Sequence, residues 1–305
     1  MDDKERDQIE WADWAARLES GRSEDFSQVF AHVRPDAADR AEWTQDWRTR
    51  AFAGLALHLL YRKTIGYRGD RPIIQASEPC SDNWGRDLER HAKRVIADRE
   101  QTAALTEQRW NETWSSADDF LSDCFAYLFR PEPYERRIRD VQKRLFEIMR
   151  TEPPLGAFVR EGVALEIKSL LADPLAALQT AVQATFPNRR DVRQYLERLD
   201  GNPIKRWASL YAFVFPLYGL KLRPGTEWFD VAYIFTTVAD GVLLRTRSHD
   251  RWERLTGGSD VFSTVILGML PDLFVVDRES VDGLPILELP KGPIRGLDDG
   301  EADDH

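Results

Sequence analysis

The sequence predicts an all-α protein. Apolar residues recur at intervals of three and four along many segments, which is the period of an amphipathic helix, whereas the alternating runs typical of strands are few and short. A chain of 305 residues with 42% hydrophobic residues can bury a sizeable core in one or two domains. No apolar run approaches the roughly 18 residues of a membrane span, so we expect no membrane segment.

Features of the whole chain also indicate where the protein resides. The opening sequence MDDKERDQIE lacks the basic and apolar regions of a signal peptide. Two cysteines, Cys80 and Cys124, are too few for a disulfide framework, which fits a reducing compartment. We therefore expect a soluble, cytoplasmic protein.

The N-terminal region predicts four successive helices. They are a first helix that ends near Ser20, a short one over roughly Glu24–Val33, a third from Asp36 to Trp47, and a long apolar one capped by Thr49. Pro35 disfavours helix at the preceding residue, which predicts a turn between the second and third helices.

The rest of the chain predicts a longer helical region and a polar tail. Residues 67–83 are rich in Gly, Pro, Ser and Asp, which predicts a loop and a domain boundary. Residues 277–305 hold nine acidic and three basic residues, and we expect disorder from about residue 290. The predicted domains are 1–66 and 84–276, followed by the acidic tail 277–305. Helices are predicted at about 84–108, 116–129, 133–151, 154–171, 173–185, 188–199, 203–220, 226–246 and 258–274.

The N-terminal helices follow one another at helix-turn-helix dimensions. The helix Val29–Val33, the turn Arg34–Pro35 and the segment Trp47–Phe52 together resemble the N-terminal domain of the TetR family of transcriptional regulators. The resemblance implies binding to operator DNA. Basic side chains around the third helix could hold phosphates while an aromatic and a hydroxyl group approach base edges. The predicted DNA-binding residues are Arg22, Arg34, Arg40, Trp43, Thr44, Arg48 and Arg50.

A second resemblance to the same family lies downstream. The segments Trp207–Gly225 and Glu227–Arg247 look like the two C-terminal helices that form a four-helix dimer interface in many TetR-like regulators. The resemblance implies a homodimer through about residues 203–246 and a small apolar or aromatic effector. Effector binding would favour a form of the dimer in which the two DNA-binding domains are wrongly spaced. They would then no longer fit successive major grooves, which lie about 34 Å apart. The predicted effector-binding residues are Trp110, Trp114, Phe120, Tyr127, Phe146 and Met149.

The charge of the third helix leaves a second interpretation open. Residues 36–47 hold four acids, Asp36, Asp39, Glu42 and Asp46, against the single base Arg40. An acidic helix opposes the phosphate contacts that supply much of DNA affinity. The alternative is an all-α protein that binds a ligand or a partner and keeps a degenerate helix-turn-helix without an operator.

An enzyme is the third interpretation. Asp118, Asp119 and Asp123 superficially resemble the metal-binding aspartate motif of class I terpene synthases, and carboxylates suit Mg²⁺. The nearest candidate for the required second motif, at Asp260, has Leu267 in place of its third ligand. We therefore interpret Asp118 and Asp119 as acids in a first helical turn, and predict no catalytic residue, metal site or cofactor.

Overall fold

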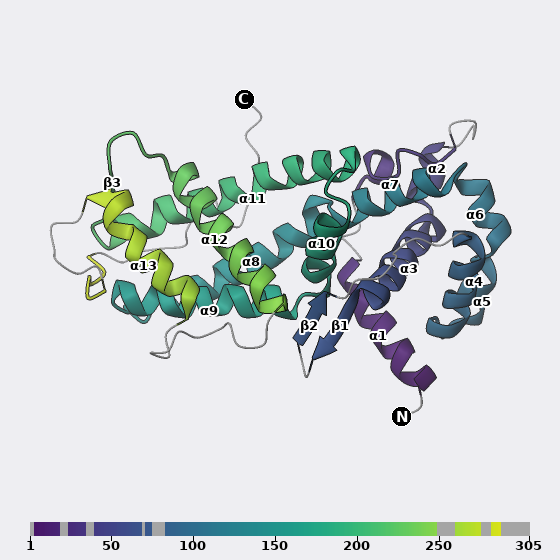
Figure 1. Cartoon of the computed structure of the whole chain (residues 1–305), viewed down its shortest axis with the longest axis horizontal. Coiled ribbons are helices and arrows are strands. Elements are labelled where there is room, and N and C mark those ends of the chain that lie inside the picture. The colour runs from purple at the N-terminus through teal and green to yellow at the C-terminus, as the bar shows by residue number, and fades with distance from the viewer. Residues whose placement is uncertain are drawn as a thin grey trace. The chain divides into compact units, whose positions relative to one another are not determined.

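We obtained the structure as a computed structural model, and it confirms the all-α class (Figure 1). It describes residues 3–18, 24–34, 40–68, 71–74, 83–248, 260–275 and 282–287. Within these ranges the chain forms thirteen α-helices, one 3-10 helix and four short strands. The predicted disorder beyond residue 290 lies outside the described residues.

The chain divides into two compact units, which are described separately. Unit 1 comprises residues 1–133 and 171–200, and unit 2 comprises residues 134–170 and 201–305. Both units are therefore built from two stretches of sequence. The predicted domains 1–66 and 84–276 have different bounds, because residues 84–133 join the N-terminal helices and the segment 171–200 returns to them.

Unit 1 is built around α3, which contacts α1, α4, α7 and α10. Its buried face carries Phe52, Leu55, Leu57 and Leu60, which are at most 1% exposed. The elements of unit 1 are α1 (Asp3–Leu18), η1 (Phe26–Gln28), α2 (Arg40–Gln45), α3 (Trp47–Thr64), β1 (Ile65–Arg68), β2 (Arg71–Ile74), α4 (Trp84–Val95), α5 (Arg99–Ala104), α6 (Glu107–Thr113), α7 (Ala117–Leu128) and α10 (Pro174–Thr185).

Buried carboxylates fasten the N-terminal segments of unit 1. Asp123 on α7 is fully buried and accepts hydrogen bonds from Trp114 Nε1 at 2.9 Å and from the backbone nitrogen of His32 at 3.0 Å. His32 Nδ1 lies 2.8 Å from the same carboxylate, and this hydrogen bond raises the pKa of His32. Because buried carboxylates need such partners, Asp123 fixes the segment before α2 against α7.

Asp7 on α1 connects this helix to α3 and α4 in the same way. It is fully buried and pairs with Arg62 of α3 at 2.5 Å and with Arg94 of α4. Burial alone would raise the pKa of Asp7, but the hydrogen bonds from the two arginines outweigh it and lower that pKa. Beside this pair lie the rings of His58 and His91, with 3.0 Å between Nδ1 and Nε2.

Unit 2 holds a separate hydrophobic core of aromatic and aliphatic side chains. The chain segment 282–287 packs on it: Leu155 and Gly156 donate backbone hydrogen bonds to Leu284 and Asp282, each at 2.9 Å. A Cβ at Gly156 would lie 2.2 Å from Oδ1 of Asp282, so this close approach requires glycine. Its elements are α8 (Pro131–Met149), α9 (Leu155–Ala172), α11 (Arg190–Leu217), β3 (Lys221–Leu222), α12 (Trp228–Ser248), α13 (Val261–Leu273) and β4 (Phe274–Val275), of which α8, α9 and α11 cross the division between the units.

Several element bounds differ from the predicted ones for local reasons. Asp46, not Thr49, caps the long N-terminal helix, because its extended backbone lets the carboxylate accept from the Arg48 nitrogen. Strands β1 and β2, which lie partly in the predicted loop, pair antiparallel and contact α10. Helix α11 runs without a break through Pro203, where two helices were predicted, and the predicted helix 84–108 is divided into α4 and α5, with Asp98 capping the second.

Replacing Asp7 by Asn tests the buried ion pairs of unit 1. We expect D7N to lower the free energy of unfolding at pH 7 by about 2–3 kcal/mol, because two arginines lose their buried partner. The pKa of Asp7 is depressed, so its contribution is present at neutral pH and is lost as the pH falls through the folded-state pKa. Urea unfolding followed by circular dichroism between pH 3 and 7 measures both effects.

The control for this prediction is D13N on the same helix. Asp13 pairs with Arg17 at 2.9 Å in an exposed position, and such pairs contribute about 0–1 kcal/mol. An equal loss in D7N and D13N, or a D7N effect that does not change in acid, would contradict the assigned role of Asp7.

Candidate ligand cavity

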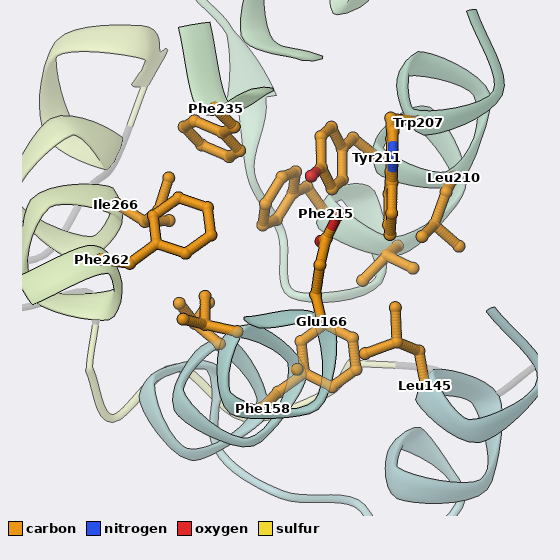
Figure 2. Close-up of a pocket in the computed structure, with 14 residues that line it drawn as sticks. Leu145, Phe158, Glu166, Trp207, Leu210, Tyr211, Phe215, Phe235, Phe262 and Ile266 are labelled. Atoms are coloured by element: carbon orange, nitrogen blue, oxygen red, sulfur yellow. The ribbon is translucent and has the colours of Figure 1, made fainter. Parts of the chain in front are cut away.

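Unit 2 contains a cavity with one acidic group among apolar walls (Figure 2). It has about 60 Å³ of space for the centre of a water-sized molecule, and a single water needs about 10–15 Å³ by the same measure. Its walls come from α8, α9, α11, α12 and α13. They are formed by Leu145, Phe158, Val159, Gly162, Val163, Glu166, Trp207, Leu210, Tyr211, Val214, Phe215, Phe235, Phe262 and Ile266.

Helical periodicity places most of these side chains. On α11, Trp207, Tyr211 and Phe215 follow one another at intervals of four and therefore share one face. Their rings form a continuous series, with centroids 5.8 Å apart for Trp207 and Tyr211 and 5.5 Å apart for Tyr211 and Phe215. Phe235 of α12 meets Tyr211 edge-on at 5.4 Å. The cavity thus has a rigid aromatic wall.

Glu166 enters the cavity from α9, opposite this wall. It follows Phe158 and Gly162 at intervals of four, so the carboxyl group occupies a position on the apolar face of the helix. Figure 2 shows its side chain extending from α9 towards the rings of α11. No hydrogen bond or ion pair joins this carboxyl to another residue of the described ranges.

Burial dominates the acidity of Glu166. It raises the pKa of the carboxyl group to about 7, with Arg137 of α8 acting to lower the pKa and Asp240 of α12 acting to raise it. Near neutral pH the carboxyl group therefore exists in both its neutral and its charged form. A group of this kind can donate or accept a hydrogen bond, or attract a cation, depending on its protonation.

Two tyrosines supply the other polar atoms around the carboxyl. Burial raises the pKa of Tyr211 well above its ordinary value, and the charge of Glu166 adds to this effect. Burial also raises the pKa of Tyr134 to about 12. The Trp207 indole donates a hydrogen bond to the Tyr134 hydroxyl, and the Arg137 guanidinium lies 4.5 Å from the Tyr134 ring centroid. Both tyrosines are therefore neutral at physiological pH.

The six predicted effector-binding residues are packed in two different cores. Trp110, Trp114, Phe120 and Tyr127 are at most 8% exposed and belong to unit 1, and Phe146 and Met149 pack in the core of unit 2. None of the six lines the cavity around Glu166. Sequence reasoning missed Glu166, although an acid in line with the apolar residues of a helix is a signal that could have identified it.

The predicted DNA-binding residues are largely engaged within unit 1. The Arg48 and Asp46 side chains pair at 2.8 Å, and the Arg50 guanidinium donates to the Gln45 carbonyl at 2.7 Å. The Arg40 guanidinium donates to the Ala31 carbonyl. Arg34 is exposed, and Arg22 lies outside the described residues.

The aromatic and hydroxyl groups of this set are also packed. Thr44 is 1% exposed and donates to the Ala41 carbonyl at 3.0 Å. The Arg109 guanidinium lies 3.9 Å from the centroid of the Trp43 ring. Of the predicted third helix, residues 40–45 form α2, while Asp46 and Trp47 are the cap and the first residue of α3. The packing and pairing of Trp43, Thr44 and Arg48 leave little side chain available to reach a base edge.

The aspartates on α7 take structural roles. Ser116 caps this helix and bonds to Asp119, while Asp118 pairs with Arg189 at 2.7 Å. The residues that the structure describes contain no group of three or more His, Cys, Asp or Glu side chains arranged to hold a metal ion. No helix in the described ranges is long and apolar enough to cross a membrane.

Comparison with known proteins gives no relative for this chain. Neither family models nor curated proteins nor solved structures match it. The cavity of unit 2 is therefore the feature from which a function is proposed.

The raised pKa of Glu166 predicts a stability effect of its own. Because the folded-state pKa lies above the ordinary value of 4.5, the folded chain loses stability as the pH rises from about 4.5 to about 7. We expect E166Q to be more stable than the parent protein at pH 8, by on the order of 2 kcal/mol, and nearly equal to it below pH 5. Urea unfolding at pH 5 and pH 8 provides the measurement.

The matched control is E161Q, an exposed position on the same helix. We expect it to leave the free energy of unfolding unchanged at both pH values. If E166Q had the same effect at pH 5 as at pH 8, the assigned acidity of Glu166 would be wrong.

Proposed function

We propose that this protein binds a small, mainly apolar molecule in the cavity of unit 2. The observation that carries the proposal is the combination of a preformed aromatic wall with a single carboxyl group. Ligand sites in proteins are typically concave, mostly apolar, and fitted with a few polar groups that orient the ligand. The role proposed for the chain is recognition of the ligand rather than its chemical conversion.

The surroundings of the cavity support this proposal over ordinary core packing. A packed core is filled to a density at which few spaces larger than a water molecule remain. A buried carboxyl group also lowers stability unless it is paired. Unit 2 contains both a space larger than a water molecule and, in its wall, a carboxyl group without a hydrogen-bond partner among the described residues. An apolar residue in place of Glu166 would pack there at lower cost in free energy. Such a local cost is common where a site serves function.

Filling the cavity tests the proposal. Benzyl alcohol serves as a neutral probe of suitable size, and its binding is measured by ligand-observed NMR and by calorimetry. We expect V214F and I266F, which enlarge two wall residues on different helices, to weaken binding about tenfold or more. V238F on α12 lies outside the cavity lining and should bind as the parent protein does.

The test uses V214F and I266F together because overpacking a core costs about 1–3 kcal/mol of stability, and a second variant remains if one does not fold. Circular dichroism confirms that each variant is folded before titration. If the parent protein does not bind the probe at millimolar concentration, or if folded V214F and I266F both bind it unchanged, the proposed function is rejected.

A DNA-binding regulator is the second candidate. It is supported by the order of α1, η1, α2 and α3, which follows the helix order of the TetR resemblance, and by the exposed Arg34. The pairing of Arg48 with Asp46 and the burial of Thr44 favour the ligand-binding proposal instead. In this second proposal, the protein forms a homodimer through about residues 203–246 and binds operator DNA. Binding of the ligand then releases the DNA.

The second candidate predicts sequence-specific, salt-weakened binding to fragments of the genomic neighbourhood in the presence of competitor DNA. Fluorescence anisotropy measures this binding, and the double variant R48A/R50A should lose it. If the parent protein binds no fragment above competitor at low salt, the DNA-binding proposal fails and the ligand-binding proposal is unaffected.

A further inference from the structure

We propose that the cavity selects a ligand that combines an apolar, ring-sized body with a protonated amine. This inference rests on the proposed function and adds the chemical class of the ligand. It depends on the position of Glu166 in the same cavity as a series of aromatic rings.

The aromatic wall is suited to a cation as well as to an apolar body. The faces of Trp, Tyr and Phe rings carry negative electrostatic potential and attract a nearby ammonium group, most strongly where water is excluded. Trp207, Tyr211 and Phe215 form one side of the cavity, and Phe235 closes it edge-on to Tyr211. An amine in the cavity would lie beside these rings and close to the Glu166 carboxylate.

Two charged residues on neighbouring helices act on Glu166 in opposite directions. Arg137 on α8 and Asp240 on α12 are the charged residues that act on this carboxyl, and Tyr134 and Tyr211 remain neutral. The α13 residues in the wall, Phe262 and Ile266, are apolar and add no charge. Glu166 is therefore the one charged side chain among the described residues that line the cavity, and an ammonium group would be its counter-charge.

The same arrangement disfavours other ligands. An anion in the cavity would lie close to the Glu166 carboxylate, and like charges at short range repel. A neutral ligand would gain the apolar contacts but not the attraction to the carboxylate. An apolar amine is therefore the ligand class that uses both the wall and the acid.

The experiment compares benzylamine with benzyl alcohol, which share the same ring and differ in the polar group. At about pH 8 we expect benzylamine to bind about tenfold more tightly than the alcohol. Phenylacetate, an anion with the same ring, should bind more weakly than either. Isothermal calorimetry on the full chain gives the three affinities.

Variants at two positions of α9 assign the preference to Glu166. E166Q keeps the size of the side chain and removes its charge, so we expect benzylamine and benzyl alcohol to bind it equally. E161Q carries the same substitution at an exposed position and should retain the tenfold preference.

The pH dependence gives an independent measurement. Benzylamine stays protonated from about pH 6 to pH 8, whereas Glu166 ionises over that interval. Its affinity should therefore rise severalfold with pH in the parent protein and stay constant in E166Q. Raising the pH should not strengthen the binding of benzyl alcohol.

The outcomes separate this inference from the proposed function. If benzyl alcohol binds as tightly as benzylamine in the parent protein, or if the amine preference survives in E166Q, the inference is overturned while ligand binding stands. If neither molecule binds at millimolar concentration, the proposed function itself fails.

Discussion

The spacing of aromatic residues along α11 is the constraint on which unit 2 depends. Trp207, Tyr211 and Phe215 share one face of the helix, and Phe235 and Phe274 pack against this series from α12 and β4. A shift of one residue in α11 would turn these rings by about 100° and separate them from their partners. The same periodicity therefore builds the core and supplies one wall of the cavity.

The acidic residues buried in the two units differ in their hydrogen-bond partners. In unit 1, Asp7 and Asp123 are fully buried, and each has several hydrogen-bond donors, so their charge contributes to holding distant segments together. In unit 2, Glu166 has the raised pKa of a carboxyl group that burial has left without such donors. This contrast within one chain separates two acids that are paired within the fold from one that has no hydrogen-bond donor among the described residues.

Periodicity was sufficient to predict the fold class and most of the helices, because each long helix buries one apolar stripe. It could not predict that α11 continues through Pro203, that β1 pairs with β2, or that 171–200 returns to unit 1, since these features depend on tertiary contacts. The site was harder to predict. The aromatic residues Trp110 and Phe146 have the same pattern as cavity-lining residues, and only the three-dimensional structure separates a packed core from a cavity.

The interleaving of the two units has a consequence for how the chain is made. Residues 134–170 leave unit 1 and residues 171–200 return to it, so unit 1 lacks α10 until the chain has been synthesised through Thr185. When its first 133 residues have been made, the part of α3 that α10 covers in the folded chain still lacks its partner. Neither unit corresponds to a continuous stretch of the chain, so exchanging unit 2 alone between two genes would require joins after residues 133, 170 and 200.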